Sequence, residues 1–286
     1  MARFDVKDLS PALGAEVSGF DPDAPIDEEA RTFLRHLFDT RYLLRFRDID
    51  ISHSQQFMLS MMLIGKDGAA LEVPPDTFYV SNRRSNKVAP YGRLQFHSDA
   101  MWAQKPFEVL SLYGVEVEQP TAPTIFVSGV EAWKTMPDDL RRRGEGLCAL
   151  HTAGPIHRRD MTDVLKNDMA DPPTAVHPLF LPHKRTGEKI IYASEQVTRE
   201  IVGMSPDESE DLLNDLFDHI YQPAHQWEHD WHERDLVIWD DFAIQHARKN
   251  VILDGPSRTL RKVAHPIPEL TEAQKPVFVP AQDAVG

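Results

Sequence analysis

The stretch Glu108-Val-Leu-Ser-Leu-Tyr-Gly-Val115 has the composition of a β-strand, because apolar and β-branched residues dominate it. From residue 78 onward the chain contains several short runs of this kind, separated by proline or charged residues. The others are Phe78-Tyr-Val-Ser81, Thr124-Ile-Phe-Val127, Lys189-Ile-Ile-Tyr192, Asp235-Leu-Val-Ile-Trp239 and Leu260-Arg-Lys-Val-Ala264. The sequence therefore predicts many short strands over its last two thirds.

Helices are predicted mainly ahead of these strands. Residues 27–38 begin with acidic residues and repeat apolar residues at helical spacing, and residues 52–62 begin with a serine N-cap. Residues 205–217 combine a serine N-cap, a proline in the first turn and acidic residues. The shorter predicted elements are strands within 10–19 and at 42–46, and helices at 130–136 and 138–143. Early helices followed by many short strands predict a mainly β fold with flanking helices, of the jelly-roll type.

The composition is that of an ordinary globular protein. The 286 residues contain 41% hydrophobic and 27% charged residues, and we find neither an internal repeat nor a low-complexity linker. A single domain spanning residues 1–286 is therefore predicted. The formal net charge of −14 argues against a nucleic-acid partner, because phosphate binding requires a basic surface.

The sequence also predicts a cytoplasmic location. Cys148 is the single cysteine, which excludes a disulfide scaffold and favours a reducing compartment. No apolar stretch approaches the roughly 18 residues that a membrane span requires, and the first residues contain no apolar signal region. We therefore expect no membrane partner.

A metal site is predicted from His97-Ser-Asp99, in the stretch Leu94-Gln-Phe-His-Ser-Asp-Ala-Met-Trp102, together with His246 far downstream. Two imidazoles and one carboxylate form the ligand set that binds Fe(II) on one face and leaves the opposite face open. On an extended segment, residues two apart project to the same side, so His97 and Asp99 can converge on one ion. We predict His97, Asp99 and His246 as metal ligands and catalytic residues.

An anion site is predicted from Gly255-Pro-Ser-Arg-Thr-Leu-Arg-Lys262, shortly after the second histidine. Arg258 is flanked by small or apolar residues, and burying its permanent charge is costly without an anionic partner. The carboxylate of a keto-acid cosubstrate suits the planar fork of arginine. On a strand, residues 258 and 262 share one face, so Lys262 is a second candidate anion contact and Arg261 a predicted surface charge. The motifs together predict an oxygenase that uses Fe(II) and 2-oxoglutarate.

Other histidines are assigned no metal role. His225 and His229 have the i, i+4 spacing of some zinc ligands, but two tryptophans crowd the run 225–232, which we interpret as a packed loop. His151 and His157 border residues 156–176, a segment of mixed charge and little periodicity. This segment is predicted to be either a lid over the site or a solvated insertion.

These motifs resemble the taurine/2,4-dichlorophenoxyacetate dioxygenase family of Fe(II)- and 2-oxoglutarate-dependent enzymes, over most of the chain from Leu13 to about Pro266. Family-like stretches lie at residues 42–47, 96–99, 176–179, 201–206, 234–241, 245–246 and 258–262. The resemblance implies a double-stranded β-helix that uses Fe(II), 2-oxoglutarate and dioxygen. It also implies a homo-oligomer, since many members of the family are dimers or tetramers.

The resemblance extends to single residues. It implies that Arg258 binds the distal carboxylate of 2-oxoglutarate, that Thr124 lies beside the same carboxylate, and that Trp239 packs near the site. Where the family usually has a second arginine that grips the substrate anion in sulfonate-cleaving relatives, this chain has Lys262. Lysine cannot supply a bidentate fork, which argues against taurine and leaves a small carboxylate or a less polar substrate.

The implied reaction is hydroxylation, desaturation or oxidative cleavage of a small, anionic organic substrate, with release of succinate and carbon dioxide. The candidate substrate contacts are Tyr79, Asn82, Trp102 and Lys262. Two alternatives remain from the residues alone. A metal-dependent hydrolase would use the same three ligands with zinc and would give Arg258 no role, and a non-catalytic jelly-roll binding module would need no convergent ligands.

Overall fold

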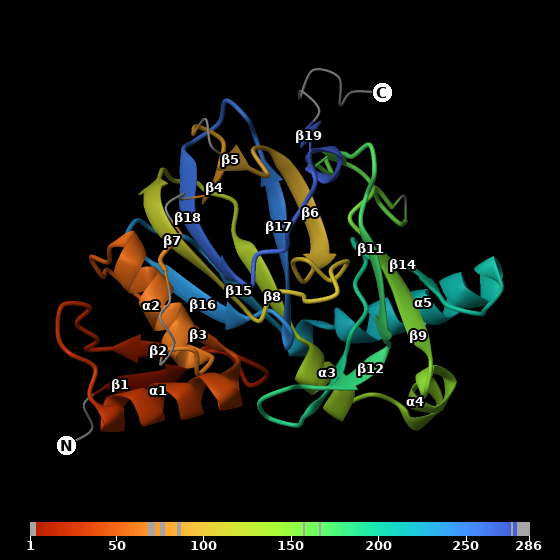
Figure 1. The fold of residues 1–286 in the computed structure, drawn as a ribbon, viewed down its shortest axis with the longest axis horizontal. Helices are drawn as coiled ribbons and strands as arrows, with labels where there is room; N and C mark the ends of the chain where they lie inside the picture. Colours follow the sequence, from red (N-terminus) through yellow and green to blue (C-terminus); the bar gives the residue numbers. More distant parts are fainter. Residues whose placement is uncertain are drawn as a thin grey trace.

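In a computed structural model of the protein, two β-sheets share the central core (Figure 1). The structure describes residues 4–67, 72–74, 78–84, 87–156, 158–165, 167–275 and 277–278. The larger sheet has the strand order β1 (Asp5–Asp8), β2 (Ala15–Ser18), β3 (Leu43–Phe46), β16 (Leu236–Asp240), β7 (Val109–Val117), β18 (Arg258–His265), β4 (Phe78–Ser81), β5 (Lys87–Val88). The smaller sheet has the order β15 (Gln226–His229), β8 (Thr124–Ser128), β17 (Ile244–Val251), β6 (Gly92–His97).

The alternation of side chains along β7 explains how the larger sheet separates two cores. Leu110 and Leu112 belong to the core cluster shared with the smaller sheet, which includes Phe126 of β8. Val109 and Tyr113 point the other way, into the cluster under the first two helices. A strand buried on both faces reads as a nearly continuous apolar run, which is why this segment is so readily recognised in the sequence.

The outer face of the larger sheet is covered by α1 (Glu28–Arg41) and α2 (His53–Leu63). Both helices begin as predicted, since the side chains of Asp27 and Ser52 accept hydrogen bonds from backbone N–H groups in the first turn. Buried polar groups of α2 are satisfied by the sheet: Nε2 of Gln56 donates to Oγ of Ser111 at 3.0 Å. The two helices therefore close this face without leaving that amide unpaired.

The residues between β8 and β15 form a third layer. It contains the sheet β11 (Thr174–Pro178), β9 (Cys148–Thr152), β14 (Thr198–Ile201), and the pair β12 (Phe180–Pro182) and β13 (Lys189–Ile191). Its helices are α3 (Gly129–Lys134), α4 (Asp138–Gly144) and α5 (Pro206–Ile220). The short helix η1 (Pro223–His225) directly precedes β15, and η2 (Glu272–Gln274) follows β18. The pair β10 (Asn167–Asp168) and β19 (Val277–Phe278) joins two distant segments. Leu212, Leu213 and Leu216 of α5 pack into this layer's core.

The predicted helices and strands are confirmed, with boundaries that differ by a few residues. Three predictions are wrong in detail. The run 225–232 is not a loop, because residues 226–229 pair with β8, and the last residues of segment 156–176 belong to β11. Arg261 is not a free surface charge, since it donates hydrogen bonds to Oε1 of Gln56 (2.7 Å) and to the carbonyl of Ile51 (2.5 Å). None of the described helices is long and apolar enough to cross a membrane.

A pH-dependent loss of stability is predicted from His151 on β9. Burial and the nearby His177 lower the pKa of His151 from 6.5 to about 3. Below pH ~6.5 the unfolded chain therefore binds a proton at His151 that the folded protein does not bind. The free energy of unfolding falls as the pH is lowered from ~6.5 toward 3. At pH 5 the cost is about 2 kcal/mol.

The measurement is urea unfolding of the wild type and of His151→Gln at pH 7 and pH 5. We expect the variant to lose about 2 kcal/mol less than the wild type between these two values. His36→Gln on the exposed face of α1 is the matched control and should follow the wild type. An equal pH dependence in all three proteins would contradict the assignment.

Candidate active site

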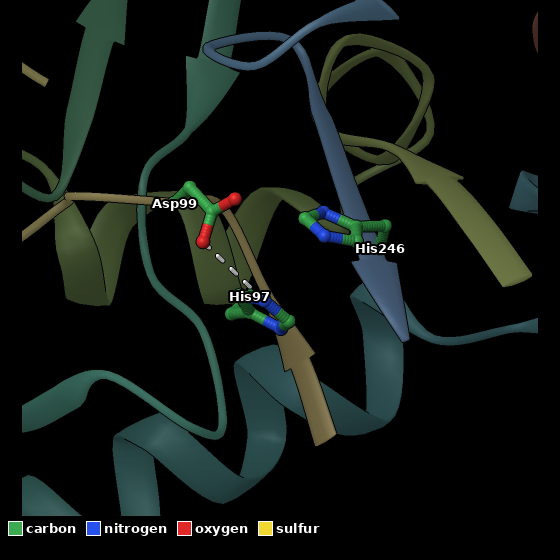
Figure 2. Close-up of side chains that lie close together, drawn as sticks. All are labelled: His97, Asp99 and His246. Atoms are coloured by element: carbon green, nitrogen blue, oxygen red, sulfur yellow. Dashed lines mark ion pairs between the residues drawn. The ribbon is translucent and has the colours of Figure 1, made fainter. Parts of the chain in front are cut away.

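The register between β6 and β17 brings two histidines together. His97, the last residue of β6, is paired directly with His246 of β17, and their ring centroids are 4.3 Å apart. Asp99 follows two residues beyond the end of β6, and the three side chains converge (Figure 2). One donor atom from each residue lies within 4.8 Å of the other two. The structure thus assembles the three predicted ligands from segments almost 150 residues apart.

Hydrogen bonds fix which atoms of this group face the centre. Nδ1 of His97 lies 2.8 Å from the carbonyl oxygen of Gln95, and a carbonyl only accepts, so Nδ1 carries the proton. Nε2 therefore keeps its lone pair, and it lies 3.8 Å from Oδ1 of Asp99. Nδ1 of His246 is buried without a hydrogen-bond partner among the described residues, 3.9 Å from Oδ1 of Asp241.

Lys262 determines the state of the carboxylate. Its Nζ donates to Oδ2 of Asp99 at 2.7 Å, which leaves Oδ1 toward His97. Burial raises the pKa of Asp99, but the positive charge and hydrogen bond of Lys262, together with the neighbouring His97 and His246, outweigh burial and bring this pKa below its ordinary value. Asp99 is consequently a carboxylate at neutral pH.

Both imidazoles are neutral at the same pH. Burial lowers the pKa of His97, and burial together with the neighbouring His97 lowers the pKa of His246 well below its ordinary value. Metal ligands must be deprotonated, so two neutral imidazoles and one carboxylate need no further proton loss before binding. Nitrogen and oxygen donors in this number fit Fe(II), with coordination positions left open.

Arg258 at the start of β18 forms a second, cationic part of the site. It is 3% exposed, and its Nε donates to the carbonyl of Ala122 at 3.0 Å and its Nη2 to Oγ1 of Thr124 at 3.1 Å. Burial and the charge of Arg248 lower its pKa well below the ordinary value. No acidic side chain within the described ranges pairs with Arg258, so an anion from outside would relieve its burial.

Trp231 contacts Thr124, although the sequence did not predict Trp231 as a functional residue. Its indole Nε1 donates to Oγ1 of Thr124 at 2.9 Å, and Trp231 is fully buried. Because Oγ1 already accepts from both Trp231 and Arg258, the hydroxyl hydrogen of Thr124 is left to donate to a third partner. Two cooperating donors, Arg258 and Thr124, are therefore available to one carboxylate.

Arg248 was also missed. It follows His246 by two residues on β17, so the period of a strand places it on the same face. Its guanidinium donates to the carbonyls of Ala89 (2.8 Å), Tyr91 (2.6 Å) and Gly92 (2.7 Å), and burial lowers its pKa to about 9. The spacing from His246 was the available signal. The hydrogen bonds show that Arg248 anchors the segment leading into β6.

A cavity of about 590 Å³ connects these groups. It is lined by the three convergent residues, by Thr124, Arg248 and Arg258, and by two of the four predicted substrate contacts, Trp102 and Lys262. Its other walls come largely from apolar side chains of several segments, including Met161, Met169 and Ile267. The volume lies in the range of small-molecule sites.

Tyr79 and Asn82 are not among the described residues that line the cavity, so their prediction as substrate contacts needs correction. The alternation along β4 turns Val80 to the cavity instead of Tyr79. Asn82 instead contacts the backbone of Arg258, because its Oδ1 accepts from the backbone N–H of Arg258 at 2.9 Å. His151 is buried beside the cavity wall without lining it, and His157 lies outside the described residues.

The fold and the donor set together place the chain among mononuclear metal-dependent oxygenases with two histidines and one carboxylate. The family model described as "Taurine catabolism dioxygenase TauD, TfdA family" matches residues 5–264. The chain belongs to this family, and it is an Fe(II)- and 2-oxoglutarate-dependent dioxygenase. The class predicted from the sequence is thereby confirmed.

Individual relatives agree with this placement. Pentalenolactone F synthase of Streptomyces avermitilis is 26% identical over 281 residues, which cover 88% of this chain and 90% of that protein. Alpha-ketoglutarate-dependent dioxygenase cnsM of Penicillium expansum is 30% identical over 189 residues, or 63% and 52% of the two chains. The crystal structure of AAD-2 in complex with Mn(II) and N-oxalylglycine has a TM-score of 0.72 at 23% identity and covers 93% of this chain and 99% of its own. This structural likeness confirms the predicted fold.

We expect His97→Ala to abolish both metal binding and turnover, because it removes the ligand whose Nε2 lone pair faces the centre. The measurements are Mn(II) titration by electron paramagnetic resonance and succinate formation with Fe(II). The exposed His36→Ala is the control for loss of a histidine elsewhere. Full activity in the His97 variant would contradict the ligand assignment.

Proposed function

We propose that His97, Asp99 and His246 hold the Fe(II), and that Arg258 and Thr124 bind the distal carboxylate of 2-oxoglutarate. The observation that carries the second assignment is the burial of Arg258 without an acidic partner among the described residues. When bound, iron and 2-oxoglutarate supply the activation of dioxygen for oxidation of the substrate. Succinate and carbon dioxide are released as the cosubstrate is consumed.

The chain's own residues orient and shield this chemistry. Lys262 holds Oδ2 of Asp99, so Oδ1 is the oxygen available to the metal. Trp231 and Arg258 both donate to Oγ1 of Thr124, which directs the threonine hydroxyl toward the carboxylate. The cavity walls exclude water from the reacting groups, which strengthens every electrostatic contact inside.

We propose that residues 156–176 are a lid of this one domain. Ile156, Met161 and Met169 from this segment line the cavity. The segment is held against β6 by backbone hydrogen bonds, from Arg93 N to the carbonyl of Asp163 at 2.6 Å and from Leu165 N to the carbonyl of Arg93 at 2.9 Å. These contacts support a wall over the site rather than a solvated insertion.

We also infer a homo-oligomer, a dimer or tetramer, in the cytoplasm. The net charge of −14 and the single cysteine support the location. The oligomeric state rests on the family to which the chain belongs. Light scattering of the purified protein would measure it directly, and a monomer at micromolar concentration would contradict it.

The proposed function is tested by anaerobic absorbance of the apoprotein on adding Fe(II) and then 2-oxoglutarate. We expect a weak visible charge-transfer band that requires both additions, as chelation of the keto acid demands. Arg258→Met should weaken 2-oxoglutarate binding on the order of 100-fold, because a charge-assisted pair to a buried group is lost.

Arg142→Met, at an exposed arginine of α4, is the matched control and should bind 2-oxoglutarate as the wild type does. No band with iron bound, or equal binding by the two variants, would contradict the cosubstrate assignment. Metal-dependent hydrolysis that needs neither dioxygen nor 2-oxoglutarate would then be the better explanation of the three ligands.

A further inference from the structure

Lys262 stands where the sequence predicted a contact to a substrate anion, but the structure gives this lysine another partner. Its Nζ lies 2.7 Å from Oδ2 of Asp99, and it lies 5.5 Å from the ring centroid of Phe107. Its side chain is only 19% exposed. A substrate anion would have to compete with a carboxylate that the metal site requires.

The other charged groups of the cavity are also engaged. Arg248 donates to three backbone carbonyls, and Arg258 is oriented by Ala122 and Thr124 toward the proposed carboxylate of the cosubstrate. Among the described lining residues no further lysine or arginine occurs. Each cation of the lining therefore already donates to an acceptor of the protein, although Nε of Arg248 is buried without a hydrogen-bond partner among the described residues.

The neutral polar groups of the lining are mostly bound within the chain. Gln95 donates to the carbonyl of Arg158, and Ser98 donates to the carbonyl of Ile244. Gln196 differs, because its Oε1 has no hydrogen-bond partner in the described part of the chain. A neutral amide of this kind suits a hydroxyl group of a substrate and does not require a charge.

The remaining surface of the cavity is apolar, and it comes from three separate segments. Val164 and Leu165 belong to the lid segment, Trp102 follows the metal motif, and Ile267 and Leu270 follow β18. Burial of apolar substrate surface against such walls is favourable in proportion to the area removed from water. At about 590 Å³ the cavity also has room for more than the small cosubstrate.

We propose that the primary substrate is a bulky, neutral and predominantly apolar molecule, and that Lys262 is a positioning residue for Asp99 instead of a substrate contact. This inference rests on the proposed function, because it assigns Arg258 and Thr124 to 2-oxoglutarate. The sequence left a small carboxylate or a less polar molecule as the substrate, and this proposal favours the second, because a small carboxylate would require the lysine to be free.

The test uses two homologous series of probes on the full-length enzyme loaded with Fe(II) and 2-oxoglutarate under anaerobic conditions. Straight-chain primary alcohols from butanol to decanol are titrated by calorimetry beside the carboxylates of equal length, with taurine as a small anion. We expect the alcohols to bind more tightly than the matched carboxylates. Their affinity should rise by up to about fourfold per methylene group.

Leu165→Gln places a polar group in the wall and should flatten this dependence on chain length, whereas Ile252→Gln, at a side chain that is 68% exposed, should not. Tighter binding of the carboxylates or of taurine, an affinity independent of chain length, or no binding of any alcohol would each overturn the proposal.

The positioning role of Lys262 has a separate readout. Lys262→Met should weaken Mn(II) binding by about ten- to a hundredfold, as loss of a group that orients a ligand does, while the preference for long alcohols persists. Lys262→Arg should restore Mn(II) binding toward the wild type. Unchanged Mn(II) affinity in Lys262→Met together with lost carboxylate binding would overturn the role.

Failure of the proposed function is distinguishable from failure of this inference. If the wild type forms no charge-transfer band with Fe(II) and 2-oxoglutarate, the proposed function falls and the substrate class falls with it. If the band forms and the carboxylates bind more tightly than the alcohols, the substrate class alone is wrong.

Discussion

The register of one strand pair is the constraint on which the site depends. His97 and His246 face each other across β6 and β17, so the two imidazoles are fixed by backbone hydrogen bonds rather than by a flexible loop. A shift of the pairing by one residue would turn His246 to the opposite face of the sheet and leave Asp99 with a single histidine. The buried side chains of Phe126 and Trp239 pack against the imidazole of His246 and restrict its orientation. Their ring centroids lie 6.4 and 5.0 Å from that of His246. The relative position of the two imidazoles is thus a property of the central core.

Two cations of the site, Lys262 and Arg258, differ in whether a carboxylate of the protein accepts from them. Lys262 is matched to Asp99, while Arg258 has backbone and hydroxyl acceptors without a carboxylate among the described residues. An arginine kept in this state costs stability, and proteins retain such arrangements at binding sites. The two cations, four residues apart on β18, therefore differ in their partners: Lys262 donates to a carboxylate and, among the described residues, Arg258 does not. The hydrogen bond from Lys262 to Asp99 is not visible in the sequence spacing.

The sequence was informative where chemistry is local and uninformative where it depends on tertiary contacts. The spacing of His97 and Asp99 and the later His246 were sufficient to predict the cluster of three side chains that the structure brings together. The amphipathic patterns of residues 27–38 and 205–217 predicted two helices correctly. The side of β4 that faces the cavity was not predictable, because a four-residue strand is too short for its alternation to show which side is buried. The sequence predicted a substrate contact at Tyr79, whereas Val80 lines the cavity. Trp231 lies in a run whose sequence predicts a loop, and its contact to Thr124 spans 107 residues of sequence. No local pattern could reveal it.

The attachment of the cavity wall to β6 has a consequence for how such an enzyme changes over evolutionary time. The segment containing Val164 and Leu165 is held by main-chain hydrogen bonds to Arg93, at the opposite end of the strand that terminates in His97. Gly92 has a φ of +77°, and a side chain there would come within 2.9 Å of the carbonyl oxygen of Asp163, so the two backbones meet closely. Main-chain contacts do not depend on the identity of the side chains that project from the wall. New substrate preferences can therefore arise by exchange of a few wall residues, while the position of His97 at the other end of the strand is preserved.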